Sequence, residues 1–251
     1  MQISKTRTMV QSYLIVGGSS DIGLELGSKL LGKGHSVTLL ARDTERVQGL
    51  VSQGAHLVQG DALDKECVQQ AVDLAKENGE GSLSGVAHLV GSLVLRPPHS
   101  LALEAFQEVI HTNLSSAFLT LSIACKSMLR TGGGRLVFTS SVAASFGLMN
   151  HEAIAAAKGG VESMVRSAAA TYSQRKIRVN AVAPGLTDTR LAETLLRSDA
   201  IREAAVNKIP IKRINEKEEI ASTMEWLLCS APDNITGQIL HLDGGMAKIS
   251  G

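Results

Sequence analysis

The 251-residue sequence is poor in aromatic residues and in cysteine, with one Trp, two Tyr, four Phe and three Cys. Cys67, Cys125 and Cys229 stand far apart and have no CxxC spacing. This pattern argues against a disulfide framework and against a cysteine zinc site. It favours a reducing compartment, and we therefore expect a cytoplasmic protein.

The sequence has no excess of charge of either sign, because 25 Lys and Arg oppose 24 Asp and Glu for a net charge of +1. Such a chain offers no electrostatic reason to bind nucleic acid or an anionic membrane. The polar start "MQISKTRTMVQS" has no long apolar run, so we expect no signal peptide and no membrane span. The seven His residues show no metal-ligand spacing, and we expect no metal.

Apolar runs and helical patterns alternate along the chain, which is 44% hydrophobic and 20% charged. We predict strands at 13–17, 35–41, 55–61, 85–91, 133–141, 177–185 and 238–245. We predict helices at 21–34, 43–54, 64–77, 101–111, 114–130, 151–173, 190–207 and 216–229. This alternation indicates a parallel sheet covered by helices on both faces. No linker divides the chain, so the prediction is a single α/β domain over 1–251: a doubly wound, seven-stranded parallel sheet (Rossmann fold).

A glycine-rich turn, "IVGGSSDIGLELG", follows the first predicted strand and opens the first predicted helix. The helix N-terminus offers backbone N–H groups and positive potential that suit a pyrophosphate. Gly17, Gly18 and Gly23 would let the backbone approach the phosphates, and Ser19 and Ser20 add hydroxyl donors. The alternative is a glycine-rich turn that binds no ligand.

The second predicted strand ends in "LLARD", where dinucleotide-binding folds contact the adenosine ribose. Arg42 could bind a 2′-phosphate through its planar guanidinium, which favours NADP over NAD. Alternatively, Arg42 is a solvated charge at a strand end, and Asp43 caps the next helix. Asp61 and Ala62, at the end of the third predicted strand, are placed to border the adenine.

Five motifs occur in order: "GGSSDIG" (17–23), "HTNLSSAF" (111–118), "GGRLVFTSSVAA" (133–144), "IRVNAVAPGLTDT" (177–189) and "ITGQILHLDGG" (235–245). Together they resemble the short-chain dehydrogenase/reductase family, and most closely its 3-oxoacyl-(acyl carrier protein) reductases. The likeness extends from Tyr13 to Gly245. This chain departs from the family's T-G-x-x-x-G-I-G motif at two positions. It has Val16 where the motif has Thr and Asp21 where the motif has its second Gly.

The resemblance implies a nicotinamide cofactor, a small carbonyl or alcohol substrate and a substrate lid at about 190–212. It implies catalytic roles for Asn113, Ser141 and Lys158. In the family's N-N-A-G motif only the glycine is kept, as Gly91, and His88 stands at its first position. The expected cofactor contacts are Gly17, Ser19, Ser20, Asp21, Ile22, Gly23, Arg42, Asp61, Ala62, Gly91, Lys158, Pro184, Gly185, Thr187 and Thr189.

The family's central motif, S-x(12)-Y-x(3)-K, places its Tyr at position 154, where this chain has Ile154. In the family this Tyr protonates the carbonyl oxygen as hydride arrives. The Lys lowers the Tyr pKa and holds the nicotinamide ribose, the Ser hydrogen-bonds the substrate, and the Asn supports a water relay. The two tyrosines of this chain, Tyr13 and Tyr172, lie too far along the sequence to replace it.

His151 is the candidate for a replacement proton donor. If the helix begins near Asn150, positions 151, 154 and 158 share one helical face. A histidine there could deliver a proton near neutral pH. Alternatively, His151 is a surface residue in the first helical turn, beside a capping Asn150.

Two functions therefore follow from the sequence. One is an oxidoreductase that transfers hydride between a nicotinamide cofactor and a carbonyl or alcohol, with an atypical proton donor. The other is a catalytically inactive nucleotide-binding subunit or sensor of the same fold. The resemblance also implies a homo-oligomer, a tetramer or dimer, that pairs through the helical stretches 101–130 and 151–173.

Overall fold

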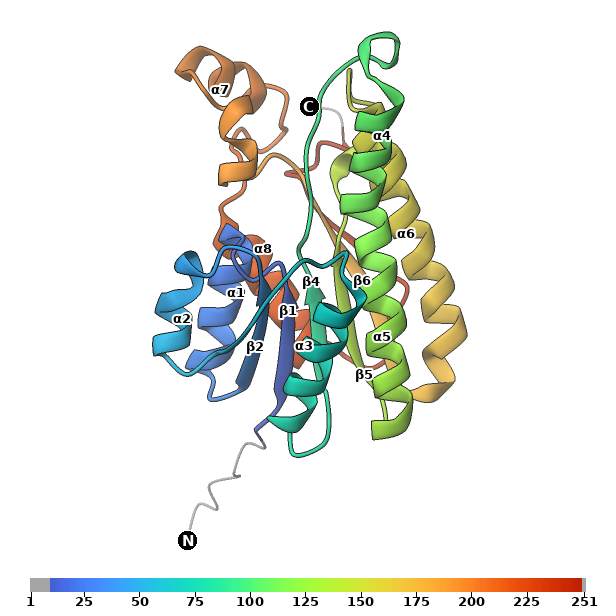
Figure 1. The fold of residues 1–251 in the computed structure, drawn as a ribbon. Coiled ribbons are helices and arrows are strands. Elements are labelled where there is room, and N and C mark those ends of the chain that lie inside the picture. The colour runs from blue at the N-terminus through green and yellow to red at the C-terminus, as the bar shows by residue number, and fades with distance from the viewer. Residues whose placement is uncertain (1–9, 250–251) are drawn as a thin grey trace, which may run out of the picture.

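The computed structural model describes residues 10–249, and it contains one sheet of seven parallel strands in this region. The strand order is β3-β2-β1-β4-β5-β6-β7. β2 and β3 therefore lie on one side of β1, and β4 to β7 lie on its other side (Figure 1). This is the doubly wound arrangement that the sequence predicts. The strands are β1 (Ser12–Val16), β2 (Ser36–Ala41), β3 (His56–Gln59), β4 (Gly85–His88), β5 (Gly134–Thr139), β6 (Ile177–Pro184) and β7 (Ile239–Leu242).

Helices cover both faces of the sheet, and the alternation of side chains along β1 shows how. Leu14 and Val16 pack with α3, α5 and α6, whereas Tyr13 and Ile15 pack with α1, α2 and α8. All four side chains are fully buried. The helices are α1 (Asp21–Gly32), α2 (Gln48–Ser52), α3 (Lys65–Glu77), α4 (Leu103–Ile110), α5 (Ser116–Thr131), α6 (Glu152–Tyr172), α7 (Asp199–Val206) and α8 (Lys217–Cys229).

The two helices predicted at 101–111 and 114–130 form one continuous helical run instead. A π-helical turn, His111–Ser115, joins α4 directly to α5. The intervening sequence has neither Gly nor Pro, so nothing in it ends the helix. π-turns inside α-helices occur frequently at functional sites, and this one contains Asn113.

Several other elements are shorter than predicted. The strand expected at 85–91 ends at His88, and those expected at 55–61, 133–141 and 238–245 are also shortened. The helix expected at 43–54 is a 3-10 turn (Glu45–Val47) followed by α2. The segment 190–207 of the expected lid is a 3-10 turn (Arg190–Leu195) followed by α7. Figure 1 shows α7 above the carboxyl ends of the strands.

Residues 10–249 also bear on the expectations about a membrane span and about the cysteines. None of the helices described there is both long enough and apolar enough to cross a membrane. All three cysteines are free, as their spacing predicts.

Candidate active site

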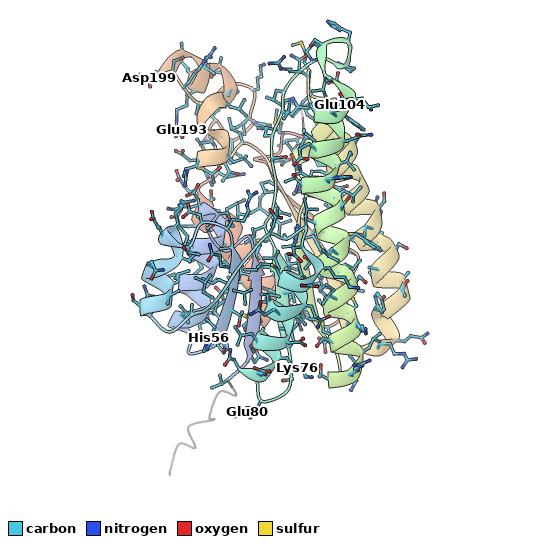
Figure 2. The ribbon with its side chains drawn as sticks, viewed as in Figure 1. His56, Lys76, Glu80, Glu104, Glu193 and Asp199 are labelled. Carbon is cyan, nitrogen blue, oxygen red and sulfur yellow. The ribbon has the colours of Figure 1, made fainter. Side chains whose placement is uncertain are left out.

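A cleft of about 920 Å³ opens at the carboxyl ends of the strands, between the sheet, the helices α4 and α6, and the segment 190–209. In Figure 2, Glu193 and Asp199 mark that segment on one side of this end and Glu104 marks α4 on the other, whereas Lys76 and Glu80 lie at the opposite end. The cleft gathers nearly all of the predicted site residues from sequence positions 17 to 189. They are Gly17, Ser19, Ser20, Asp21, Ile22, Arg42, Asp61, Ala62, Gly91, Asn113, Ser141, His151, Lys158, Pro184, Gly185, Thr187 and Thr189.

Gly23 does not line the cleft, and its role is to let the glycine turn close. A Cβ at this position would lie 2.7 Å from the backbone oxygen of Gly17. Ser20 caps α1, since its Oγ accepts the N–H of Gly23 at 3.0 Å. The same hydroxyl donates to the Gly17 oxygen at 2.8 Å, so within the turn its proton is already used. Gly17 itself has φ +87°, which favours glycine. The turn therefore presents backbone N–H groups at the start of α1, as a pyrophosphate site requires.

Asp21 and Arg46 form an ion pair beside the turn that the sequence analysis did not anticipate. The Arg46 Nη2 lies 2.6 Å from Asp21 Oδ1, and their side chains are only 25% and 16% exposed. Burial raises the pKa of Asp21, but hydrogen bonds from the Arg190 N–H and from Arg46 outweigh it, and the net shift is downward. Arg46 lies four residues after Arg42, in a segment expected to be an ordinary helix, so no motif identified it.

Arg42 reaches into the cleft from the end of β2, as predicted. Its guanidinium is 77% exposed and lies 3.4 Å from Asp61 Oδ2, a long and solvated contact. Such a pair is held weakly. The guanidinium can therefore turn toward a phosphate bound at this edge of the cleft.

Asn113 is fully buried in the π-turn, and hydrogen bonds fix its amide at both ends. Its Oδ1 accepts the N–H of Ser92 at 3.2 Å, and its Nδ2 donates to Val109 O and Ser92 Oγ, both at 3.0 Å. Gly91 leaves room for this arrangement, because a Cβ there would lie 3.1 Å from Asn113 Oδ1 and 3.6 Å from Lys158 Nζ. Asn113 and Lys158 thus meet at Gly91.

Lys158 is buried under the cleft, at 5% exposed. Its Nζ donates to the backbone oxygen of Thr139 at 2.8 Å, at the end of β5. Burial lowers the pKa of its amine from 10.5 to about 8. A lysine with this pKa exchanges its proton nearer to neutral pH than an exposed lysine does.

His88 is buried in the core and does not line the cleft. It is buried between two hydroxyls, with Nδ1 at 3.0 Å from Thr120 Oγ1 and Nε2 at 3.1 Å from Ser116 Oγ. Ser116 donates its own proton to Thr112 O, so it accepts from Nε2–H, which assigns the tautomer. Burial lowers the pKa of His88 to about 3, and its ring stays neutral.

Ile154, at the position of the missing Tyr, is part of a small apolar cluster and is 4% exposed. Val109, Ala143 and Ala157 pack around it. The two tyrosines both lie in the described region and neither lines the cleft. Ser141, across the cleft wall, accepts the N–H of Ala143 at 3.2 Å, and its own hydroxyl proton has no partner among residues 10–249. The cleft thus keeps a hydroxyl donor for a substrate oxygen and has lost the phenol.

His151 lines the cleft from the residue just before α6, which begins at Glu152. No side chain caps this helix, so the capping role considered for Asn150 is wrong. The ring nitrogen Nδ1 lies 2.8 Å from the backbone oxygen of Met149. A carbonyl oxygen only accepts, so Nδ1 carries the proton and Nε2 is the basic nitrogen. His151 can donate a proton from Nε2 only when its ring is charged.

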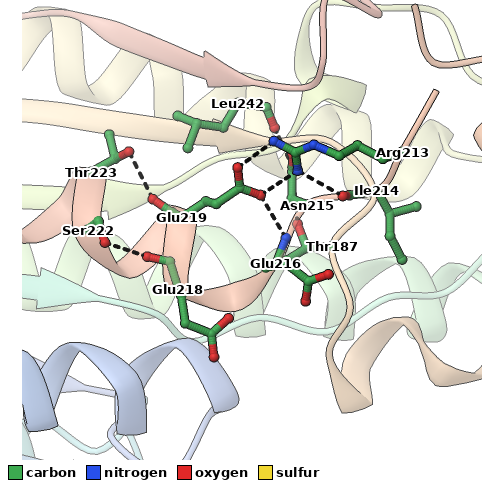
Figure 3. Close-up of polar contacts among 10 residues, drawn as sticks. All are labelled: Thr187, Arg213, Ile214, Asn215, Glu216, Glu218, Glu219, Ser222, Thr223 and Leu242. Carbon is green, nitrogen blue, oxygen red and sulfur yellow. Dashed lines mark hydrogen bonds and ion pairs between the residues drawn. The ribbon is translucent and has the colours of Figure 1, made fainter. Parts of the chain in front are cut away.

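The far wall of the cleft follows β6 and is held from beneath by a polar network (Figure 3). Thr187 pairs with Asn215 in an isolated parallel bridge, and Asn215 Nδ2 donates to Leu242 O. Beside Asn215, Arg213 binds both oxygens of Glu219 at 2.7 and 2.6 Å.

Residues 10–249 contain no cluster of three or more His, Cys, Asp or Glu side chains able to hold a metal ion.

Comparison with known proteins adds relatives of similar length. A family model described as Enoyl-(Acyl carrier protein) reductase matches residues 17–247. The 3-oxoacyl-(acyl-carrier-protein) reductase MabA of Mycobacterium tuberculosis is 32% identical, with 94% of this chain and 92% of that protein aligned. Carbonyl reductase family member 4 of Danio rerio is 35% identical, over 95% and 98%. The structure of a short-chain type dehydrogenase/reductase from Mycobacterium ulcerans superposes with a TM-score of 0.88 at 29% identity, covering 94% of this chain and 90% of that one.

Proposed function

Because the chain belongs to the short-chain dehydrogenase/reductase family, whose members related to it are oxidoreductases, we propose that it transfers hydride between NADP and a carbonyl or alcohol substrate. The observation that supports this most is the meeting of Ser141, Lys158 and Asn113 in the cleft that also holds the glycine turn. A protein that only bound nucleotide would have no need of the three together.

The cleft fits a nicotinamide dinucleotide at its cofactor end. The glycine turn presents the start of α1, and Gly17 has no room for a Cβ, which would lie 3.0 Å from the Leu89 backbone. Arg42 places an exposed guanidinium group just after the end of β2, which supports NADP over NAD. The cofactor supplies the hydride when bound.

The residues of the chain orient the reacting groups and move the proton. The Ser141 hydroxyl donates to the substrate oxygen, where negative charge develops. The Lys158 ammonium would hold ribose hydroxyls of the cofactor, and it lies near Asn113 at Gly91. The proton would reach the substrate from a water molecule beside Lys158 or from His151, whose Nε2 faces no protein partner among residues 10–249.

The walls beyond Ser141 favour an apolar carbonyl substrate. Apolar side chains from four parts of the chain surround this end of the cleft, and Lys208 also lines it. Two of the relatives are a 3-oxoacyl-(acyl-carrier-protein) reductase and a carbonyl reductase family member, and an apolar carbonyl substrate agrees with both names. The apolar residues are Leu93, Leu95, Leu148, Ile154, Leu191, Leu195, Ile209 and Met246.

The second candidate, an inactive nucleotide-binding subunit, is favoured by Ile154 alone. Its burial in an apolar cluster removes the family's acid without leaving a gap for a substitute at the same position. We favour the enzyme, since the loss of general acid catalysis lowers a rate by about 10²–10⁴ and leaves the hydride chemistry in place.

We also propose a cytoplasmic homo-oligomer. Phe118 and Leu129 on α5 are 62% and 44% exposed, large apolar side chains on one of the two helices through which the family resemblance predicts pairing. Light scattering of wild type and Phe118→Asp tests this, with dissociation of the variant expected.

The test of the function has two stages. NADPH and NADH are titrated by fluorescence into wild type and Arg42→Ala, and tighter binding of NADPH that the variant loses is expected. A panel of apolar ketones and thioester-linked 3-oxoacyl compounds is then reduced with wild type, Ser141→Ala and His151→Ala. Failure to bind either dinucleotide would remove both candidate functions, and binding without turnover would leave the inactive subunit.

A further inference from the structure

Asp21 occupies a position where a carboxylate opposes the proposed cofactor. It is the first residue of α1, where the family pattern has glycine and where the pyrophosphate of a dinucleotide lies against the helix N-terminus. An isolated negative charge at this point would repel the pyrophosphate. The structure shows two contacts of this carboxylate, one with Arg46, which opposes the repulsion, and one with the backbone of Arg190.

The first contact is the ion pair with Arg46. The guanidinium comes from the 3-10 turn after β2 and binds both Asp21 Oδ1 and, through Nη1, the backbone oxygen of Ser19. Lys217 adds further positive potential to the same carboxylate. Because the Asp21 and Arg46 side chains are largely buried, their attraction is less screened than that of a surface pair.

The second contact ties Asp21 to the lid. Its Oδ2 accepts the backbone N–H of Arg190 at 2.8 Å, across 169 residues of sequence. Arg190 is the first residue of the lid's 3-10 turn, which Thr189 precedes. A second ion pair joins Arg202, in the α7 helix of the lid, to Asp188 just before the lid, at 2.8 Å.

We propose that Asp21 is a positioning residue that fastens the start of the lid to the cofactor turn, and that Arg46 cancels its charge so that the pyrophosphate can bind beside it. The inference rests on the proposed function for its cofactor half. The lid half concerns the protein without ligand and stands separately.

A double-mutant cycle tests the charge-cancelling role. NADPH and NADH are titrated into wild type, Arg46→Ala, Asp21→Gly and the double variant. Arg46→Ala is expected to weaken both cofactors at least about tenfold, and the double variant to return to within about threefold of wild type. Arg46→Gln, which keeps a donor for Ser19 O without the charge, is expected to behave as Arg46→Ala does.

Two results would overturn this role. If the double variant binds as weakly as Arg46→Ala, the guanidinium contacts the cofactor itself. If only NADPH is affected, Arg46 is a 2′-phosphate ligand and not a partner of Asp21.

Hydrogen exchange of the Arg190 amide in the ligand-free protein tests the tie to the lid. Exchange in Asp21→Gly is expected to be at least about tenfold faster than in wild type, because the amide loses its acceptor. Glu25→Ala, one turn further along α1, is the matched control and is expected to leave this amide unchanged. Equal protection in Asp21→Gly and wild type would overturn the tie. Wild type that binds neither cofactor would remove the proposed function and the cofactor half, while the exchange result would still decide the lid half.

Discussion

Polar side chains have different binding partners at the two ends of the cleft, the proposed cofactor end around the glycine turn and the proposed reaction end around Ser141 and Lys158. At the cofactor end, side chains bind one another across the sequence: Arg46 binds Asp21, and Asp21 binds the start of the lid. At the reaction end, the polar side chains mostly bind nearby backbone, as Lys158 does at Thr139 O and His151 at Met149 O. The family has its catalytic Tyr at this end, and this chain has Ile154 at that position.

This difference separates binding from chemistry. The proposed cofactor end presents backbone donors at the start of α1 and the exposed guanidinium of Arg42. The proposed reaction end has Ser141 and Lys158 in place but has Ile154 where the family has its acid. Binding should therefore resemble that of the family, and turnover should be slower and more dependent on pH.

The largest expected effect comes from removing the amine at the reaction end. Lys158→Ala should lower kcat for carbonyl reduction by about 10²–10⁴, because the variant loses both the ribose contact and the proton relay. Steady-state kinetics with NADPH measure this. Lys65→Ala, on the exposed start of α3, is the control. Equal rates for Lys158→Ala and wild type would mean that the reaction end does not work as proposed.

Restoring the phenol should give the next largest effect. Ile154→Tyr is expected to raise kcat at least about tenfold, since a general acid returns to the motif position. The larger ring enters a packed cluster and should cost about 1–3 kcal/mol of stability, which thermal unfolding measures. Ile154→Phe is the matched control with the same ring and no hydroxyl. A gain in Phe equal to that in Tyr would show that packing, not acid catalysis, changed the rate.

The dependence of the rate on pH tests the same end without altering a side chain. Burial lowers the pKa of Lys158 to about 8, so its ammonium is lost as pH rises above 8. kcat/KM for reduction should then fall about tenfold per pH unit. Lys158→Arg keeps its charge and should extend the plateau to higher pH.

Titration of Lys158 does not destabilise the folded state in this range. Between pH 8 and 10.5 the folded state binds fewer protons at Lys158 than the unfolded state does, so this group makes stability rise with pH. Melting curves over the same range show whether the folded state persists. A fall in rate that disappears in His151→Ala would assign the proton to His151.

The sequence alone predicted the fold, because apolar strands between amphipathic helices specify the sheet. The family resemblance pointed to Asn113, Ser141 and Lys158, and all three line one cleft. The π-turn at Asn113 was missed, since no Gly or Pro marks it. The Asp21–Arg46 pair was missed because its partners are 25 residues apart, in segments that only tertiary structure brings together. The catalytic roles remain predictions.

The smallest expected effect concerns the support beneath the far wall of the cleft, where Glu219 lies next to Asn215 and Thr187 (Figure 3). Hydrogen bonds from Arg213, and then from the Glu216 N–H, lower the pKa of Glu219 to about 2. A carboxyl whose pKa is lowered by folding stabilises the folded state above its unfolded pKa of about 4.3, and this contribution is lost as pH falls toward 2. The side chain is 38% exposed, so solvent screening limits the contribution to about 1 kcal/mol or less.

Glu219→Gln should therefore lower the melting temperature by a few degrees at pH 7, and the difference from wild type should shrink between about pH 4.5 and 2. Glu218→Gln is the control, because Glu218 is half-exposed and pairs only distantly, at 3.9 Å, with Lys217. Because Asn215 supports Thr187, an expected cofactor contact, NADPH affinity should fall slightly and KM for the carbonyl substrate should stay unchanged. If Glu219→Gln instead raises KM and leaves NADPH binding unchanged, Thr187 acts on the substrate and not on the cofactor.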